Sequence, residues 1–390
     1  MLLPALADPT DAEAIVFGDR KLTYRELAGT ASAIAKRLVG DRVAVWATPT
    51  IETCAAVVGA LAAGVAVVPV NPKVGERELE HILGDSAPAQ VLAAPGVELP
   101  GGLASLPRLD VDLSVRDEGL PPEPDAEAPA FIVYTSGTTG PPKGVVMPRR
   151  AIASNLDSLA AAWEWTAADV VTHALPIFHV HGLVVGVLGP LRRGGAVHHL
   201  GKFSSAAAAA ELAGPATMMF GVPTMYHRLA ADVEADPELA KQVAQARLLV
   251  SGSAALPATC HERISKATGQ RIVERYGMTE TLMNCSVRAW GRAPARHRRH
   301  PGRRRGRAAR GRRRRGRLRQ RRRHHRRDRG PWPEPVPGVP QPPRRDRRGD
   351  ARRLVPHRRH GHPRPGRLHP DRRPAGHRHH QERRLQDRRR

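Results

Sequence analysis

The stretch "ETCAAVVGALAAGVAVVPVNP", from Glu52 to Pro72, decides the fold class. Its first part is almost entirely apolar, which predicts a buried helix followed by a glycine turn. The β-branched residues after the turn predict a buried strand, which ends at Asn71 and Pro72. A short strand, "RVAVWA", comes shortly before this unit. Strand, helix and strand on this scale predict an α/β fold with a parallel sheet covered by helices on both faces.

The same alternation continues through the first 289 residues. The segment "LTYRELAGTASAIAKRL", from Leu22 to Leu38, has apolar residues at helical spacing. Further strands in "APAFIVYTSGTTG", "ARLLVSGSAAL" and "QRIVERYGMTE" run into loops that are rich in Gly, Ser and Thr. Ligands bind beyond the carboxyl ends of strands in parallel sheets, so these loops predict a binding site.

The charge of the chain is distributed very unevenly. Its 390 residues, enough for two or three domains, carry a formal net charge of +26. Residues 1–289 contain 24 basic and 30 acidic residues, whereas residues 290–390 contain 39 basic and 7 acidic ones. A basic balance ordinarily indicates a nucleic-acid partner, but here the excess is confined to one end. The chain therefore divides into a mildly acidic globular region, 1–289, and a strongly basic tail, 290–390.

Three cysteines, Cys54, Cys260 and Cys285, have neither metal-ligand spacing nor the pattern of a disulfide framework. The start "MLLPALADPTDAEA" lacks the basic region and long apolar region of a signal peptide. The longest apolar run, from Ala55 to Val70, is too short to cross a bilayer. These features predict a cytoplasmic enzyme with reduced thiols and no membrane partner.

The loop "TSGTTGPPKG", from Thr135 to Gly144, carries the strongest chemical signal. Backbone N–H groups and hydroxyls of such a loop can converge on phosphate oxygens, and Lys143 supplies a positive charge. It is not a Walker A loop, because Lys143 is followed by Gly144 rather than by Ser or Thr. An ordinary turn between strands is the alternative, but the length and order of the match favour phosphate binding.

Three motifs together resemble a known family. "YTSGTTGPPKG" at Tyr134–Gly144, "PIFHVHG" at Pro176–Gly182 and "YGMTET" at Tyr276–Thr281 resemble, in order and spacing, motifs of the acyl-adenylate-forming superfamily of acyl-CoA synthetases. The segments "WATP", "GPLRRGG", "GVPTMYHR" and "ERYGMTETLMN" are most similar to malonyl-CoA synthetases of the actinobacterial type. The resemblance implies that residues 1–289 form the large N-terminal domain of the adenylate-forming fold, with parallel sheets flanked by helices.

The resemblance implies an ATP-dependent acid–thiol ligase. ATP and a short carboxylate, with malonate or methylmalonate favoured, would form an acyl-adenylate and pyrophosphate. The thiol of coenzyme A would then displace AMP. Charge develops on phosphate and acyl oxygens in both steps, so the chemistry needs fixed hydrogen-bond donors and a metal ion, here Mg²⁺.

The resemblance also implies roles for individual residues. The expected catalytic residues are Lys143, His179, Thr279 and Glu280, with His179 beside the substrate carboxylate and Glu280 as the Mg²⁺ ligand. The residues expected to bind ATP or AMP are Thr135, Ser136, Gly137, Thr138, Thr139, Gly140, Lys143, Gly252, Ser253, Ala254, Tyr276, Gly277 and Thr279. Tyr276 would stack on adenine and Thr279 would contact the α-phosphate. The alternatives are that Tyr276 is an ordinary core residue and that Glu280 is a solvated loop carboxylate.

A substrate with a second carboxylate needs a cation in the acyl pocket, because an unpaired buried carboxylate is costly. Arg228 in "GVPTMYHR" and Arg275 in "ERYGMTE" are the candidates, since both flank segments that line the acyl site in the family. The alternative is that either one is an ordinary surface arginine.

The basic tail has the composition of a protein read in the wrong frame. From Gly291 onward it uses ten residue types, with Trp332 as the one exception, and their codons can all begin with G or C. In a GC-rich gene, a one-base slip that turns third codon positions into first positions produces such a tail. Reading His379–Arg390 one base later can yield "IIKSGGYKIGAG", which resembles the family's hinge-proximal motif. Leu354–His362 can likewise yield "WFRTGDMAT", which contains its ribose-binding aspartate motif. We therefore expect residues 290–390 to be an out-of-frame product of a mutation or a sequencing error near Ala289.

A frameshift at this point would remove the hinge and the small C-terminal domain, whose lysine the family uses for adenylation. The tail, poor in large apolar residues, is then expected to be disordered and the chain as written inactive. Two alternatives to a ligase remain. One is a nucleic-acid-binding protein with an arginine-rich arm, which the absence of lysine after Lys266 disfavours. The other is a binding-only remnant with weak ATP affinity. No specific nucleic-acid partner is expected, and the oligomeric state stays open.

Overall fold

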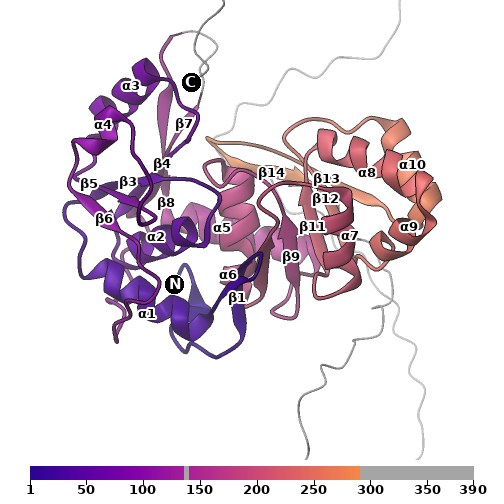
Figure 1. Cartoon of the computed structure of the whole chain (residues 1–390), viewed down its shortest axis with the longest axis horizontal. Coiled ribbons are helices and arrows are strands. Elements are labelled where there is room, and N and C mark those ends of the chain that lie inside the picture. Colours follow the sequence, from indigo (N-terminus) through magenta and orange to yellow (C-terminus); the bar gives the residue numbers. More distant parts are fainter. Residues whose placement is uncertain (136–139, 290–390) are drawn as a thin grey trace, which may run out of the picture. The chain divides into compact units, whose positions relative to one another are not determined.

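Two β-sheets and the helices around them make up the part of the chain that the computed structural model describes, residues 1–135 and 140–289 (Figure 1). The loop residues 136–139 and the whole basic tail, 290–390, lie outside the described residues, so the expectations for the tail are not addressed by this structure.

The larger sheet has eight strands. Their spatial order is β14 (Leu282–Ser286), β13 (Ile272–Met278), β12 (Leu248–Ser251), β11 (Met218–Gly221), β9 (Val170–His173), β10 (Ala196–His199), β1 (Glu13–Phe17) and β2 (Arg20–Thr23). The second sheet has six strands. Their order is β6 (Arg108–Asp110), β5 (Gln90–Ala93), β3 (Arg42–Trp46), β4 (Ala66–Val70), β7 (Pro129–Thr135) and β8 (Lys143–Pro148).

The predicted α/β fold with parallel sheets flanked by helices is confirmed, and both sheets are mixed rather than entirely parallel. Most neighbouring strands are parallel, but β1–β2, β7–β8 and β13–β14 are antiparallel pairs. Only Thr279, Glu280 and Thr281 separate β13 from β14. A parallel crossover needs a dozen or more residues, so connections this short can only close hairpins.

Helices lie in most of the connections between strands, including those between the parallel neighbours. They are α1 (Tyr24–Ala35), α2 (Ile51–Ala62), α3 (Glu76–Ser86), α4 (Gly101–Ala104), α5 (Arg149–Trp163), α6 (Gly189–Arg193), α7 (Ser205–Ala213), α8 (Pro223–Ala235), α9 (Pro237–Val243) and α10 (Ala258–Thr268), with a short 3₁₀ helix η1 (Pro4–Leu6) and a π-helix η2 (His181–Leu188). The helix predicted from Leu22 begins at Tyr24, because Thr23 accepts a hydrogen bond from the amide of Glu26 and Glu26 caps Thr23 in return.

The central prediction from the sequence is confirmed: α2 is buried from Ile51 to Leu61, and β4 follows it after Gly64. The core around α2 joins the two sheets, since it includes Ile15 of β1 and Val43 of β3. A helix that is apolar on all sides must be covered on all sides, and this one is enclosed by both sheets and α1.

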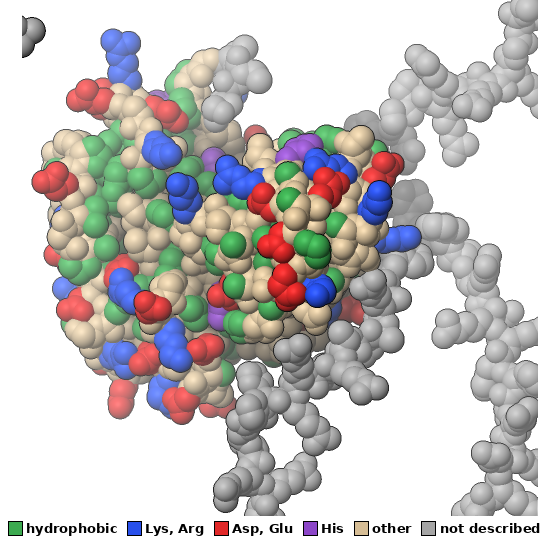
Figure 2. All heavy atoms as spheres, turned by 45° about the vertical axis from the view of Figure 1, so that its right-hand side comes forward, with side chains coloured by type: hydrophobic (Ala, Val, Ile, Leu, Met, Phe, Trp, Pro, Cys, Tyr) green, Lys and Arg blue, Asp and Glu red, His purple; other side chains and the backbone are tan. Residues whose placement is uncertain are grey.

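The described surface carries both signs of charge. On the face that Figure 2 shows, acidic and basic side chains are interspersed over the described residues rather than collected in one patch. None of the helices in residues 1–135 and 140–289 has both the length and the apolar character needed to span a bilayer.

Candidate functional site

The carboxyl end of β12 brings three segments of the chain together. Gly252 follows this strand, and a Cβ atom at this position would lie 2.3 Å from Cζ of Arg275 on the neighbouring β13. The next residue, Ser253, has φ of 72°, a left-handed conformation that non-glycine residues seldom adopt. Its hydroxyl lies 3.4 Å from Nδ1 of His181. Strained residues of this kind cluster at functional sites, which points to this strand end.

Arg275 is the most unusual charged residue in this cluster. It is 7% exposed, and its Nε and Nη2 are buried without a hydrogen-bond partner among the described residues. Burial lowers the pKa of Arg275 to about 10, so the guanidinium is still charged at neutral pH. A buried cation without an acceptor is costly, because it has lost its water and gained nothing in return. The site is therefore suited to an anionic ligand that supplies the missing acceptor atoms.

His181 lies beside Arg275 at the start of the π-helix η2. It is buried, and its Nε2 has no partner within the described part of the chain. Desolvation, and secondarily the charge of Arg275, lower the pKa of His181 well below its ordinary value, so its ring is neutral at physiological pH. Gly182 permits this placement, because a Cβ atom there would lie 2.2 Å from the carbonyl oxygen of Pro176. Short π-helices are frequent at functional sites.

The end of β13 and the turn that follows it carry the residues expected to contact adenine, the α-phosphate and Mg²⁺. Tyr276 is 57% exposed, so the alternative that it is a core residue is wrong. The register of the β13–β14 pair shifts at Tyr276 and Gly277, where a Cβ atom on Gly277 would lie 2.2 Å from the carbonyl oxygen of Leu282. Thr279 is half-buried in this turn, and Glu280 is exposed. Such irregularities re-aim side chains and are common next to active sites.

The side chains of the described residues suit a magnesium ion only in combination with phosphate oxygens of a bound nucleotide. Within the described ranges, no group of three or more His, Cys, Asp or Glu residues could hold a metal ion. Glu280 is a single exposed carboxylate that makes no ion pair with the described residues. Because Mg²⁺ is usually held by one or two carboxylates together with substrate phosphates, Glu280 suits such an ion when a nucleotide is bound.

The β7–β8 hairpin carries the predicted phosphate loop. Thr135 and Lys143 are paired across its two strands, and Gly140 has φ of 93°. Ser136, Gly137, Thr138 and Thr139 lie outside the described residues. In the described part of the chain, no hydrogen bond or ion pair joins Thr135 or Lys143 to the cluster around Arg275.

The remaining predicted residues lie at exposed positions. His179 is exposed, and the protein around it lowers the pKa of its ring by desolvation. Ala254 is exposed in the loop after β12. Arg228 is exposed on α8 and makes no ion pair with any described residue, whereas Arg275 is buried. The two candidate arginines thus have very different surroundings.

Two residues of the site were not predicted. The motif "PIFHVHG" contains two histidines, and the sequence analysis assigned a role to His179 but not to His181, which is buried. Glu274 precedes Arg275, and its carboxylate accepts hydrogen bonds from the Leu256 amide at 3.0 Å and from His261 Nε2 at 2.9 Å. It therefore ties the loop after β12 to β13. The sequence did contain a signal that distinguishes Glu274 from Arg275. Successive side chains of a strand project from opposite faces of the sheet, so these two neighbours have different surroundings.

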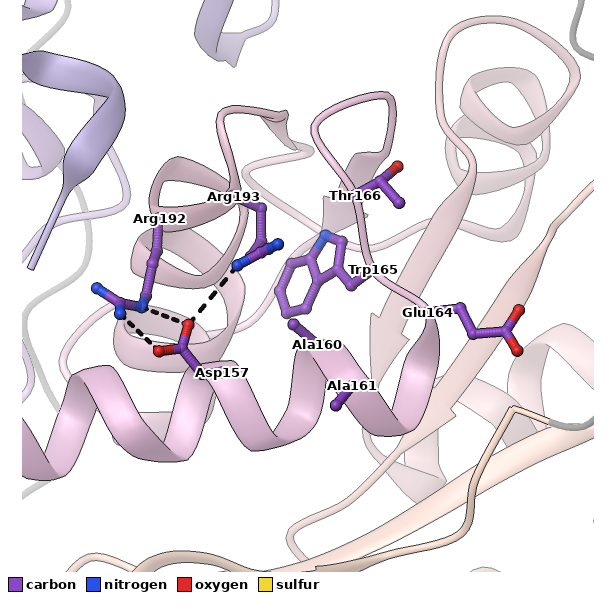
Figure 3. A pocket seen from close by; sticks show the side chains of 8 residues that line it. All are labelled: Asp157, Ala160, Ala161, Glu164, Trp165, Thr166, Arg192 and Arg193. Carbon is purple, nitrogen blue, oxygen red and sulfur yellow. Dashed lines mark hydrogen bonds and ion pairs between the residues drawn. The ribbon is translucent and has the colours of Figure 1, made fainter.

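A hollow of about 610 Å³ lies elsewhere, beside α5 and α6, and contains none of the predicted site residues (Figure 3). Arg192 binds both carboxylate oxygens of Asp157, at 2.9 and 2.7 Å, and also donates to the backbone carbonyls of Met1 and Leu2. The hydrogen bonds from Arg192 hold the pKa of Asp157 below its usual range. The motif "GPLRRGG" thus anchors the start of the chain to α5.

The chain is similar to known proteins over most of its described residues. The family described as AMP-binding enzyme matches residues 4–310. A solved malonyl-CoA ligase, in a ternary product complex with methylmalonyl-CoA and AMP, is 63% identical, with a TM-score of 0.71 over 74% of this chain and 64% of that chain. ATP-bound MatB from Rhodopseudomonas palustris is 34% identical, with a TM-score of 0.66 over 75% of this chain and 61% of that chain.

A malonate–CoA ligase of Arabidopsis thaliana is 36% identical over 282 residues, which is 64% of this chain and 46% of that protein. The chain spans about half the length of the curated relatives it matches. The family match covers most of the described residues and includes all three motifs and the cluster around Arg275. The chain belongs to the AMP-binding enzyme family.

Proposed function

We propose that this chain carries the nucleotide and carboxylate site of an AMP-forming acid–thiol ligase that acts on malonate or methylmalonate. The observation that carries this proposal is the buried guanidinium of Arg275, which lacks an acceptor among the described residues and lies against Gly252 at a strand end. The likeness to a malonyl-CoA ligase that holds methylmalonyl-CoA and AMP supports the same substrate class.

In the first step, a carboxylate oxygen of the substrate attacks the α-phosphorus of ATP, and the bond to pyrophosphate breaks. Negative charge shifts onto the phosphate oxygens, so donors that are already in place lower the barrier. Thr279 would contact the α-phosphate, while Thr135, Ser136, Thr138, Thr139 and Lys143 would hold the β- and γ-phosphates. Tyr276, with Gly252, Ser253 and Ala254, would bind the adenine. Mg²⁺, held by Glu280 and the phosphates, would neutralise part of the charge.

In the second step, the sulfur of coenzyme A attacks the acyl carbon and AMP leaves. The thiol proton is lost to solvent, so the products are the thioester, AMP and pyrophosphate. His179 would lie beside the reacting carboxylate. His181 is neutral and buried, so its Nε2 is suited to donate to an acyl oxygen.

The distal carboxylate of malonate would be held by Arg275, Arg228 or both. Arg275 is buried beside His181, and Arg228 lies exposed on α8 without an ion pair among the described residues. A guanidinium can bind a carboxylate through two parallel hydrogen bonds, which discriminates a diacid from a monoacid of similar size.

The test is the binding of malonate and propionate, in the presence of AMP, to the full chain and to Arg275→Ala and Arg228→Ala. Removing the partner of the distal carboxylate should cost about 2 to 4 kcal/mol of malonate binding free energy and leave propionate unchanged. Arg37→Ala, an exposed arginine outside the site, is the matched control. If both variants keep the parent's preference for malonate, the assignment of the arginines is wrong.

Turnover is measured separately, as release of pyrophosphate with ATP and malonate, in the full chain and in a version whose reading frame is restored after Ala289. The same loss should then appear in kcat/KM for malonate. A chain that binds ATP and malonate but releases no pyrophosphate would be a binding-only protein. If the restored enzyme prefers monoacids, the malonate assignment fails while the ligase assignment stands.

A further inference from the structure

The helix α3 contacts β7 and the residue just before β8 through two side chains. His81 Nε2 donates to the carbonyl oxygen of Pro142 at 2.7 Å. Asp85 Oδ2 accepts a hydrogen bond from the hydroxyl of Tyr134 at 2.6 Å. His81 and Asp85 are four residues apart in α3, so they project from one face of the helix toward the hairpin.

The Tyr134 ring joins these contacts into one arrangement. It lies edge-on to the ring of His81, with centroids 6.2 Å apart. It also covers Gly144 on the opposite strand, where a Cβ atom would lie 3.0 Å from Cζ of Tyr134. Partial burial, and secondarily the hydrogen bond to Asp85, raise the pKa of the Tyr134 hydroxyl, so it remains a donor at neutral pH. Glycine at position 144 therefore lets the tyrosine lie flat across β8 and reach α3.

The two contacts lie near the two ends of the predicted phosphate loop, Thr135–Gly144. Tyr134 comes immediately before Thr135, and Pro142 comes immediately before Lys143. Thr135 and Lys143 face each other across the hairpin. One helix thus contacts the residue before Thr135, where β7 ends, and the residue before Lys143, where β8 begins.

We propose that His81 and Asp85 are positioning residues for ATP, acting through Tyr134 and Pro142 on the two ends of the phosphate loop. This inference rests on the proposed function. Side chains that are held in place before a ligand arrives lose less conformational entropy on binding, so holding Thr135 and Lys143 strengthens binding of the ligand groups that these two residues contact. Those groups are the β- and γ-phosphates, which ATP has and AMP lacks.

The difference between ATP and AMP gives a direct test with the full chain. Tyr134→Phe removes one hydroxyl and leaves the charge of the protein unchanged, and His81→Ala removes the second contact. Each variant should weaken ATP binding about fivefold, the effect of one lost hydrogen bond, and change AMP binding less than twofold. His81→Gln, which retains a donor at a similar reach, should recover most of the ATP affinity. Glu80→Ala is the control, because Glu80 is exposed on α3 and its side chain makes no hydrogen bond or ion pair with the described residues of the hairpin.

Hydrogen exchange of the nucleotide-free chain supplies a second measurement. The amides of Thr135 and Gly144 should exchange faster in Tyr134→Phe and His81→Ala than in the parent, while amides in β12 should not change. Equal losses of ATP and AMP binding, failure of His81→Gln to recover ATP binding, or unchanged exchange in both variants would overturn the positioning role. If the parent binds neither nucleotide, the proposed function itself is overturned, and the positioning role with it.

Discussion

Two buried histidines act as neutral hydrogen-bond acceptors at the ends of neighbouring strands. Nδ1 of His173 accepts from the Leu175 amide at 3.1 Å, and Nδ1 of His199 accepts from the Gly201 amide at 2.9 Å. Nε2 of His199 donates to the Leu175 carbonyl, and the two rings meet edge-on with centroids 4.7 Å apart. Both contacts require an unprotonated Nδ1. Each histidine thus shapes the turn after its own strand, β9 or β10.

These residues should make the stability of the described region fall in mild acid. Burial lowers the pKa of His173 and His199 below the ordinary value of about 6.5 in the unfolded chain. The unfolded state therefore binds more protons once the pH drops below about 6.5, and stability present above that pH is lost as it falls toward the folded pKa values. Each such histidine contributes at most about 1.4 kcal/mol per pH unit.

The measurement is the free energy of unfolding in urea between about pH 7.5 and about pH 5.5. His173→Asn retains an acceptor near the position of Nδ1 but cannot take up a proton, so its stability should depend less steeply on pH than that of the parent. The exposed His227→Asn is the control and should keep the parent's slope. An unchanged slope in His173→Asn would contradict the role given to this residue.

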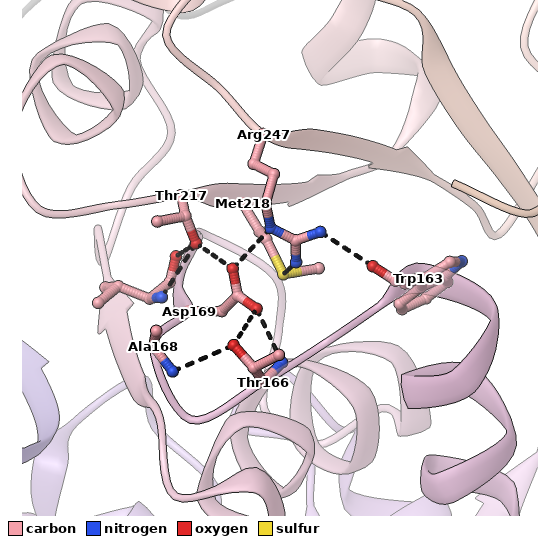
Figure 4. A network of polar contacts seen from close by, with 8 residues as sticks. Trp163, Thr166, Ala168, Asp169, Thr217, Met218 and Arg247 are labelled. Carbon is pink, nitrogen blue, oxygen red and sulfur yellow. Dashed lines mark hydrogen bonds and ion pairs between the residues drawn. The ribbon is translucent and has the colours of Figure 1, made fainter. Parts of the chain in front are cut away.

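At the scale of elements, a polar network around the buried carboxylate of Asp169 ties the amino-terminal ends of several strands together (Figure 4). Asp169 Oδ1 accepts from Arg247 Nε at 2.7 Å and from Thr217 Oγ1 at 2.8 Å, and its Oδ2 accepts from the Thr166 amide at 2.8 Å. Arg247 also donates to the carbonyl oxygen of Trp163 at the end of α5. Asp169 directly precedes β9, Thr217 directly precedes β11, and Arg247 directly precedes β12. The Asp169 carboxylate thus connects the starts of three strands, and Arg247 links them to α5.

Loss of Arg247 should destabilise the described region strongly. The side chain of Asp169 is only 4% exposed, so Arg247→Ala leaves a buried carboxylate without its cation. We expect a loss of about 2 to 4 kcal/mol in the free energy of unfolding, less than for a fully buried pair because Arg247 itself is 30% exposed. Arg263→Ala, which breaks the exposed pair with Glu234, should cost at most about 1 kcal/mol. Equal losses in the two variants, measured by urea unfolding, would disprove the special role of this network.

At the scale of the whole molecule, the distribution of charge motivates a prediction about the gene. Residues 290–390 hold 39 of the 63 basic residues. With a suitable choice of synonymous codons, a reading one base later can give motifs that resemble those of the family, in the same order. We expect the genomic DNA to contain one extra base, or to lack two, near the codon for Ala289. Resequencing across the codons for Val287 to Pro294 is the measurement. A clean read that confirms the present frame, with no G/C bias at the inferred third positions, would rule the frameshift out.

The sequence by itself determined the fold class and the strand ends where the site lies. The apolar run from Ile51 to Leu61 matches a fully buried helix, and strands ending at Thr135 and Ser251 run into the predicted loops. These features were predictable because burial pattern and turn chemistry are encoded in neighbouring residues. The mixed nature of the sheets was not recognised, although the short connection from β13 to β14 already required a hairpin.

Only the tertiary structure separated residues that look alike in sequence. Arg228 and Arg275 occur in similar contexts, yet one is exposed and the other is buried against Gly252. His81 and Asp85 carried no motif, and they became candidates because α3 meets a hairpin that follows about fifty residues later. Burial, an unpartnered donor and a shifted pKa arise from contacts between distant segments. A local sequence pattern does not show which distant segments will be in contact. The burial of a residue, its lack of a hydrogen-bond partner and its pKa shift therefore depend on the packing of the whole domain.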